Sequence, residues 1–119
     1  MIIAAVIIKD GFKLTGKSHR AVAEKAEKLG LDFEKWYNDE TRKGFIKDDG
    51  TILDRYGAFN EANRNGQICE EFNTSELSPL NSDMINFTPA QLVLAESFEI
   101  RPPIKTQGRS ISQIVGGVR

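Results

Sequence analysis

The pattern of apolar and polar residues at the start of the chain predicts a β-hairpin followed by a helix. Residues 2–9 form an apolar run rich in β-branched side chains, which is typical of a buried strand. The Asp-Gly pair at residues 10–11 predicts a tight turn, because glycine supplies the positive φ that such turns need, and residues 12–14 then return antiparallel. Ser18 is a good N-cap for a helix that ends before Gly30.

The same pattern occurs a second time after residue 43. Residues 44–47 and 51–53 are expected to be strands on either side of a turn at residues 48–50, and Asp54 is expected to cap a helix over residues 55–65. Equal spacings in the two helices support a repeat: Val22, Ala26 and Gly30 correspond to Ala58, Ala62 and Gly66. Neighbouring repeats usually bury each other's apolar faces.

We therefore expect an α+β fold in which two β-hairpin–helix units complete one small antiparallel sheet, with both helices on one face. These units take up residues 1–83, with an aromatic-rich connector at 31–37 and a polar linker at 38–43 between them. Residues 84–119 contain a third helix over residues 90–98 and a tail, and we expect them to pack on the core or on a partner subunit.

Composition narrows the class of protein. A length of 119 residues fits one domain, and a net charge of −1 argues against a protein that coats DNA or a membrane surface. The single cysteine, Cys69, excludes an internal disulfide, which is consistent with the cytoplasm. The apolar start has no basic residues before it and is too short for a signal peptide or a membrane span.

Residues 11–18 carry the letters G-x-x-x-x-G-K-S of a phosphate-binding P-loop. A working P-loop curls around phosphate between a parallel strand and a helix, whereas the Asp-Gly turn here predicts an antiparallel hairpin. The intervening residues 12–15 alternate like a strand, and Phe12 would crowd the phosphate. We interpret the match as accidental, so that a nucleotide-hydrolysing enzyme is the weaker hypothesis.

The helix starts still favour anions. Lys17, His19 and Arg20 surround the first predicted helix N-terminus, where free N–H groups and the helix dipole attract negative charge. Asp54 and Arg55 lie at the second, so the pair would suit a ligand with two phosphates. The competing interpretation is that both caps are purely structural, and caps are commoner than sites.

No catalytic or metal-binding set is evident in the sequence. His19 is the only histidine, which removes two-histidine metal sites, and the neighbouring Ser18 is poorly placed to act as its nucleophile. Cys69 is expected to be a small core residue, and the acidic residues are expected to lie on the surface. We expect no enzyme activity and no cofactor.

A set of short motifs within residues 1–83 resembles a group of small phage proteins, the anti-Thoeris sponge proteins. The matching stretches are Gly16-Lys-Ser-His19, Ala26-x-x-x-Gly30, Gly44-Phe45 with Gly50, Asp54-Arg55-x-x-Ala58-x-x-x-Ala62-x-x-x-Gly66-Gln67, and Leu80-x-Ser82-Asp83. The sequence departs from that pattern at Tyr56-Gly57, where the family usually has an acidic residue before the alanine.

The resemblance implies a phage anti-defence protein that binds a nucleotide signal without turnover. Such sponges sequester cyclic ADP-ribose isomers (glycocyclic ADP-ribose) made by bacterial TIR-domain enzymes, and some also hold cyclic di- or trinucleotides. They work in the host bacterial cytoplasm as homodimers or larger assemblies of dimers, with no DNA or membrane partner.

Two groups of residues are candidates for the ligand site. The motif positions that carry over from the resemblance are Lys17, His19, Arg55 and Gln67. Residue type adds basic side chains for phosphate and an amide with a stacking face, which are Arg20, Arg101, Arg109, Asn86 and Phe87. The alternative function is a protein–protein interaction or virion-associated module without a small-molecule ligand.

Overall fold

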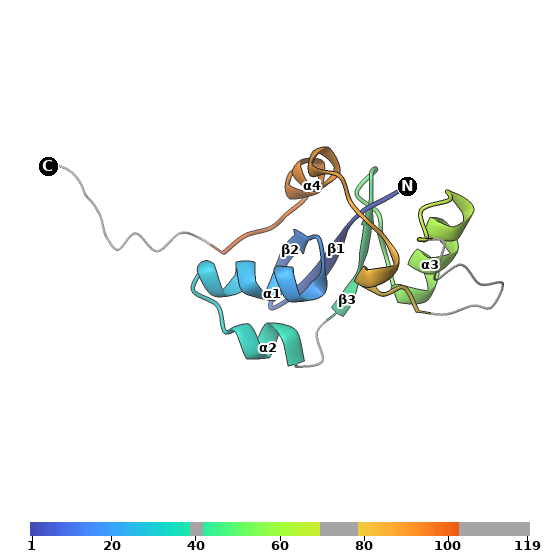
Figure 1. The fold of residues 1–119 in the computed structure, drawn as a ribbon. Coiled ribbons are helices and arrows are strands. Elements are labelled where there is room, and N and C mark those ends of the chain that lie inside the picture. Colours follow the sequence, from blue (N-terminus) through green and yellow to red (C-terminus); the bar gives the residue numbers. More distant parts are fainter. Residues whose placement is uncertain (39–41, 70–78, 103–119) are drawn as a thin grey trace, which may run out of the picture.

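The computed structural model describes residues 1–38, 42–69 and 79–102, and Arg109 therefore lies outside the described residues. Its strands are β1 (Ile2–Lys9), β2 (Phe12–Gly16), β3 (Arg42–Lys47) and β4 (Ile52–Leu53). Its helices are α1 (His19–Lys28), α2 (Phe33–Asn38), α3 (Arg55–Arg64) and α4 (Pro89–Glu96), with a short 3₁₀ helix, η2, over Ser82–Met84. Figure 1 gives the arrangement of these elements.

The predicted α+β fold is confirmed. The strands form one four-stranded sheet in the order β2-β1-β3-β4, and every neighbouring pair is antiparallel. The first hairpin turns at Asp10 and Gly11, which have φ angles of 53° and 83°. That pair of left-handed residues matches the twist of the strands, which is why an Asp-Gly sequence closes this hairpin.

The two predicted units are related by a local twofold axis that passes through the centre of the sheet. The sequence repeat places Ile8 in correspondence with Ile46, and the same correspondence places Val6 with Gly44. Val6 and Gly44 are paired with each other across β1 and β3. The two units of the sequence repeat therefore occupy equivalent positions in the sheet. Each unit contributes one inner strand, β1 or β3, and these two strands pair with each other.

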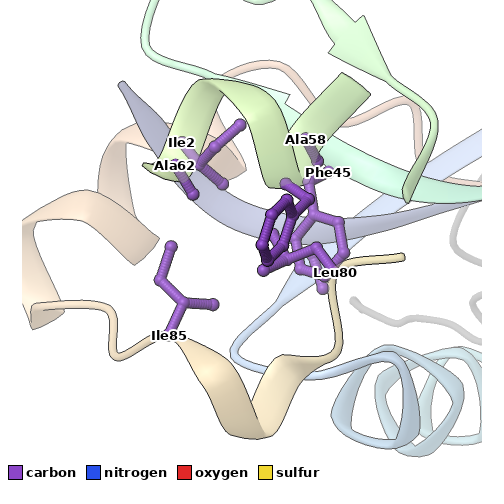
Figure 2. Close-up of a cluster of buried hydrophobic side chains, with 8 residues drawn as sticks. Ile2, Phe45, Ala58, Ala62, Leu80 and Ile85 are labelled. Carbon is purple, nitrogen blue, oxygen red and sulfur yellow. The ribbon is translucent and has the colours of Figure 1, made fainter. Parts of the chain in front are cut away.

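Helices α1 and α3 lie on the same face of the sheet, as predicted. Helix α1 packs on Ile7 and Leu14 of the first unit, and α2 adds the buried ring of Trp36 to that cluster. Helix α3 packs on a second cluster, shown in Figure 2. Its fully enclosed members are Ile2, Ala5, Phe45, Ala58, Phe59, Ala62, Leu80 and Ile85.

Helix α4 covers the opposite face. Ala95 packs with Val6 and Ile46, which alternate along their strands with the residues that face α1 and α3. Strand β1 is therefore buried on both faces, and this explains its unbroken apolar run.

The segment after α4 continues onto the edge of β2. Ile100 exchanges two backbone hydrogen bonds with Lys13, at 2.8 and 2.9 Å. The Glu99 carboxylate accepts hydrogen bonds from the Thr15 amide at 2.8 Å, the Thr15 hydroxyl at 2.9 Å and the Lys25 ammonium at 2.7 Å. Within the described residues, the C-terminal part packs on the core of its own chain.

Two local features differ from the sequence-based expectation. The sequence predicts a polar linker at residues 42 and 43, but β3 begins at Arg42 and is six residues long. The polar side chains of these two residues suggest a linker, but the strand begins before its first apolar residue. Pairing with β1 extends β3 back to Arg42. Helix α4 ends at Glu96, and Ser97 already lies at its C-cap.

Candidate functional site

The residues that spell the P-loop pattern form a strand and a capped helix. Phe12 to Gly16 pair antiparallel with β1, so their backbone does not curl into a phosphate cradle. The Thr15 amide, which such a cradle would direct at phosphate, donates to the Glu99 carboxylate instead. The hairpin interpretation of residues 11–18 is confirmed.

The start of α1 is attached to the second unit through His19. The Ser18 hydroxyl caps the helix by accepting from the Ala21 amide at 3.0 Å. The His19 Nε2 lies 2.8 Å from the Gly44 carbonyl oxygen, and its ring meets the Phe45 ring edge-on at 5.1 Å between centroids. Because a carbonyl only accepts, Nε2 carries the proton in this contact.

The start of α3 is attached to the segment around Leu80. The Asp54 carboxylate caps the helix by accepting from the Gly57 amide at 2.7 Å. Arg55 donates through Nε to the Leu80 carbonyl at 3.0 Å, and its guanidinium also bonds the Asn81 side-chain oxygen. The Leu80 amide returns a hydrogen bond to the Arg55 carbonyl at 2.8 Å.

Lys43 of β3 and Arg55 place two positive charges near His19, and we call these three residues the helix-start cluster (His19, Lys43 and Arg55). Burial lowers the pKa of His19, the hydrogen bond to Gly44 opposes that change, and the charges of Lys43 and Arg55 lower the pKa further. The histidine is therefore neutral at pH 7. Lys43 donates to the Tyr37 carbonyl at 2.5 Å and lies 5.1 Å from the centroid of the Tyr37 ring.

A pocket of about 350 Å³ opens beside the helix-start cluster, where β4 ends. Its wall is made by Arg42, Lys43, Ile52, Leu53, Asp54 and Gly57. Strand β4 pairs only with Phe45 and Ile46, so among the described residues the start of β3 has no partner strand on this side. The volume falls in the range of small-molecule sites.

Two residues fix the character of this pocket. Arg42 is exposed, and its side chain makes no hydrogen bond or ion pair with any residue in the described ranges, so its guanidinium is available to an anion. Gly44 lies beside the wall, and a Cβ there would come within 2.3 Å of the Leu53 carbonyl oxygen. Only glycine lets the end of β4 approach β3 so closely.

The structure brings some of the predicted site residues together. His19 and Arg55 belong to the helix-start cluster, and Lys17 and Arg20 flank His19 in sequence. Lys17 is exposed and has no ion pair among the residues that the structure describes, whereas Arg20 Nε lies 3.8 Å from a Glu24 carboxylate oxygen.

Other predicted site residues lie elsewhere and have partners within the chain. The Gln67 amide accepts from the Ile2 amide at 2.9 Å and donates to its carbonyl at 2.8 Å. Asn86 contacts the Cys69 sulfur at 3.6 Å, and Phe87 packs at the edge of the cluster in Figure 2. Arg101 donates to Glu99 at 2.7 Å. Their part in ligand binding stays a prediction.

Sequence reasoning missed Arg42 and Lys43, because both were placed in a linker. A signal was present: Lys43 and Phe45 are two residues apart and share the face of β3 that α1 and α3 cover. The alternation was hidden by the glycine between them and by the short apolar stretch that follows.

Among the described residues, Glu99 and Glu61 are carboxylates whose side chains are almost fully covered, and both have a lowered pKa. Burial would raise the pKa of Glu99, but hydrogen bonds from Lys25, Thr15 and Arg101 outweigh it, and the pKa is lowered. A hydrogen bond from the Met1 amine, followed by one from Asn65, lowers the pKa of Glu61. Neither group suits a general acid, which needs a raised pKa. Within the described ranges, no three histidine, cysteine or acidic residues gather as a metal site.

Scans against protein-family models, curated proteins and solved structures each returned no match. Several residues of the motif stretches lie in contact with one another in the fold. His19 contacts Gly44 and Phe45, and Phe45 packs with Ala58 and Leu80. None of the helices in the described residues is long and apolar enough to span a membrane.

Proposed function

We propose that this protein binds and sequesters a phosphate-bearing cyclic nucleotide signal, of the cyclic ADP-ribose class, without turning it over. The observation that carries the proposal is the pocket at the end of β4, whose wall includes Arg42 and Lys43 and which adjoins the helix-start cluster. Basic side chains on both faces of the strand end, beside a concave wall, offer one cation to each phosphate of a ligand with two phosphates.

The composition of the wall suits a nucleotide rather than a bare anion. Arg42 offers a planar guanidinium that can bind phosphate with two hydrogen bonds. Ile52 and Leu53 offer apolar surface for a base or a sugar face, and the Asp54 carboxylate can accept from ribose hydroxyls. The first turn of α3 begins at the same wall and adds partial positive charge.

Binding without hydrolysis agrees with the local chemistry. The protonated nitrogen of His19 is bonded to the Gly44 carbonyl, not to a hydroxyl or thiol that it could activate. Residues 12–16 lack the P-loop conformation. The resemblance to the anti-Thoeris sponge proteins supplies the remainder of the proposal: a signal made by TIR-domain enzymes, action in the host bacterial cytoplasm, and assembly into homodimers or larger forms.

The test is native mass spectrometry of the protein purified from cells that express a TIR-domain defence enzyme. We expect the oligomer to carry a mass increment equal to a cyclic ADP-ribose isomer, and heating should release that ligand intact. Arg42→Glu should lose the increment, while Lys28→Glu, an exposed lysine at the far end of α1, should keep it. Recovery of degraded ligand, or an unliganded wild type, would refute the proposal.

A specific observation favours a second candidate, a protein–protein interaction module. Helix α4 leaves Val93 67% exposed and Leu94 43% exposed, on a helix whose only charged residue is Glu96. Large apolar side chains on an outer face often mark interfaces. Light scattering of wild type and Val93→Glu would separate the two candidates: an assembly that depends on Val93, together with no thermal shift on adding cyclic ADP-ribose, would favour the module.

A further inference from the structure

We infer that ligand binding beside the helix-start cluster is coupled to the uptake of a proton by His19, so that affinity for a phosphate ligand rises as pH falls. This inference rests on the proposed function, because it concerns the same pocket. It means that the fraction of protonated His19 rises when the anion binds.

The hydrogen bonding of His19 leaves only Nδ1 of the imidazole ring to take up a second proton. Nε2 donates to the Gly44 carbonyl, so the neutral ring carries its lone pair on Nδ1. No hydrogen bond to Nδ1 is formed by the residues that the structure describes. Protonation at Nδ1 therefore adds a charge and a donor without breaking the contact that attaches α1 to β3.

Three influences keep the ring neutral in the free protein. The side chain is largely removed from water between α1 and the sheet, and it packs against the Phe45 ring. The charged groups that act on it are Lys43 from β3 and Arg55 from α3, and both disfavour a further positive charge.

An anion in the pocket weakens one of these influences, the charge of Lys43. Lys43 lines the pocket and also acts on His19, so a phosphate beside Lys43 offsets the charge that the imidazole feels. The effect acts through space and needs no direct contact between phosphate and His19. If one proton is taken up on binding, the affinity for the ligand rises about tenfold for each unit by which the pH falls. The coupling is reciprocal, so protonation of His19 also strengthens ligand binding.

The experiment is isothermal titration calorimetry of the full chain near pH 6.5, with cyclic ADP-ribose as the probe and sulfate, which does not titrate near this pH, as an anion-only comparison. Running each titration in buffers of different ionisation enthalpy gives the number of protons exchanged. We expect wild type to take up a fraction of one proton per site. His19→Gln, whose amide can donate to the Gly44 carbonyl, should bind with no proton uptake and with an affinity that no longer varies with pH.

The outcomes separate this inference from the proposed function. Wild-type binding with the same heat in every buffer overturns the inference and leaves the function standing, and an unchanged proton number in His19→Gln does the same. If neither probe binds wild type, the proposed function fails and the inference fails with it. Should His19→Gln not fold, ¹⁵N NMR of wild-type His19 decides: a pKa that does not rise when the probe is added overturns the inference.

Discussion

The two β-hairpin–helix units follow one plan but differ at the outer strand. In the first unit β2 is five residues long and pairs with β1 along its whole length. In the second, β4 is two residues long, and Asp54 caps α3 directly after it. The short β4 leaves the start of β3 without an outer neighbour among the described residues, and that is where the pocket lies.

This difference separates what builds the fold from what builds the site. The shared plan gives the four-stranded sheet, the twofold axis at the Val6–Gly44 pair, and two capped helix starts. The departure from the plan gives a concave wall lined by Arg42, whose side chain has no ion pair within the described ranges. In a fully symmetric molecule β4 would be as long as β2 and would cover that wall. The difference in length between β2 and β4 is therefore what leaves the wall open.

The largest expected effect comes from the aromatic residue at the centre of each unit's core. Phe45→Ala removes a fully buried ring beside Ala58 and Leu80 and should lower the free energy of unfolding by about 3–5 kcal/mol. Trp36→Ala should cost a similar amount in the first unit. Urea denaturation measures both. Only Phe45→Ala should also disturb His19, so unchanged His19 NMR shifts in that variant would contradict the link between the units.

The carboxylate that joins the C-terminal segment to the first unit should have the next largest effect. The Glu99 side chain is 1% exposed, and Glu99→Ala leaves the Thr15 amide without its acceptor and Lys25 with only the Glu96 carboxylate at 3.6 Å, at a cost of about 2–3 kcal/mol. Glu99→Gln keeps one acceptor oxygen and should cost less. Thermal unfolding compares the variants, and acetate should raise the Tm of Glu99→Ala more than that of wild type. Equal stability of all three proteins would contradict this account of the segment.

A glycine in each unit offers a finer comparison. Gly44→Ala places a Cβ 2.3 Å from the Leu53 carbonyl oxygen, so the backbone of β4 must move, and we expect a loss of about 1–3 kcal/mol. Gly16→Ala in the first unit meets a Val22 methyl at 3.2 Å and the Val22 backbone nitrogen at 3.3 Å, a milder approach than that at Gly44, and should cost about 1 kcal/mol. Chemical denaturation of both variants tests the order. The reverse order would mean that the approach of β4 to β3 is not tight.

The smallest expected effect is a pH dependence that His19 introduces. The unfolded chain protonates His19 near pH 6.5, whereas the folded protein keeps it neutral to lower pH. The unfolded state therefore binds more protons in that window, and the free energy of unfolding should fall as pH drops below about 6.5. His19→Gln should flatten this part of the profile. A second loss at more acidic pH, from the lowered pKa of Glu99, should persist in that variant.

Local sequence determined the elements and their repetition. The Asp10-Gly11 turn, the caps at Ser18 and Asp54, and the apolar run of β1 each act through neighbours in the chain, so each could be predicted without the fold. The matched spacings of the helices then predicted one sheet with α1 and α3 on a single face, and the structure confirms it.

Only the tertiary structure decided which polar side chains meet. Gln67 has both amide atoms bonded to Ile2, and Arg101 is paired with Glu99, whereas Arg42 and Lys43, assigned to a linker, line the pocket. The sequence predicts that the two helix starts favour anions. It also predicts the short outer strand that ends before Asp54. It could not determine that β3 would begin at Arg42 and bring Arg42 and Lys43 to a wall beside the second helix start, because that extension depends on pairing with Ile8 and Ile7 of β1, far apart in the chain.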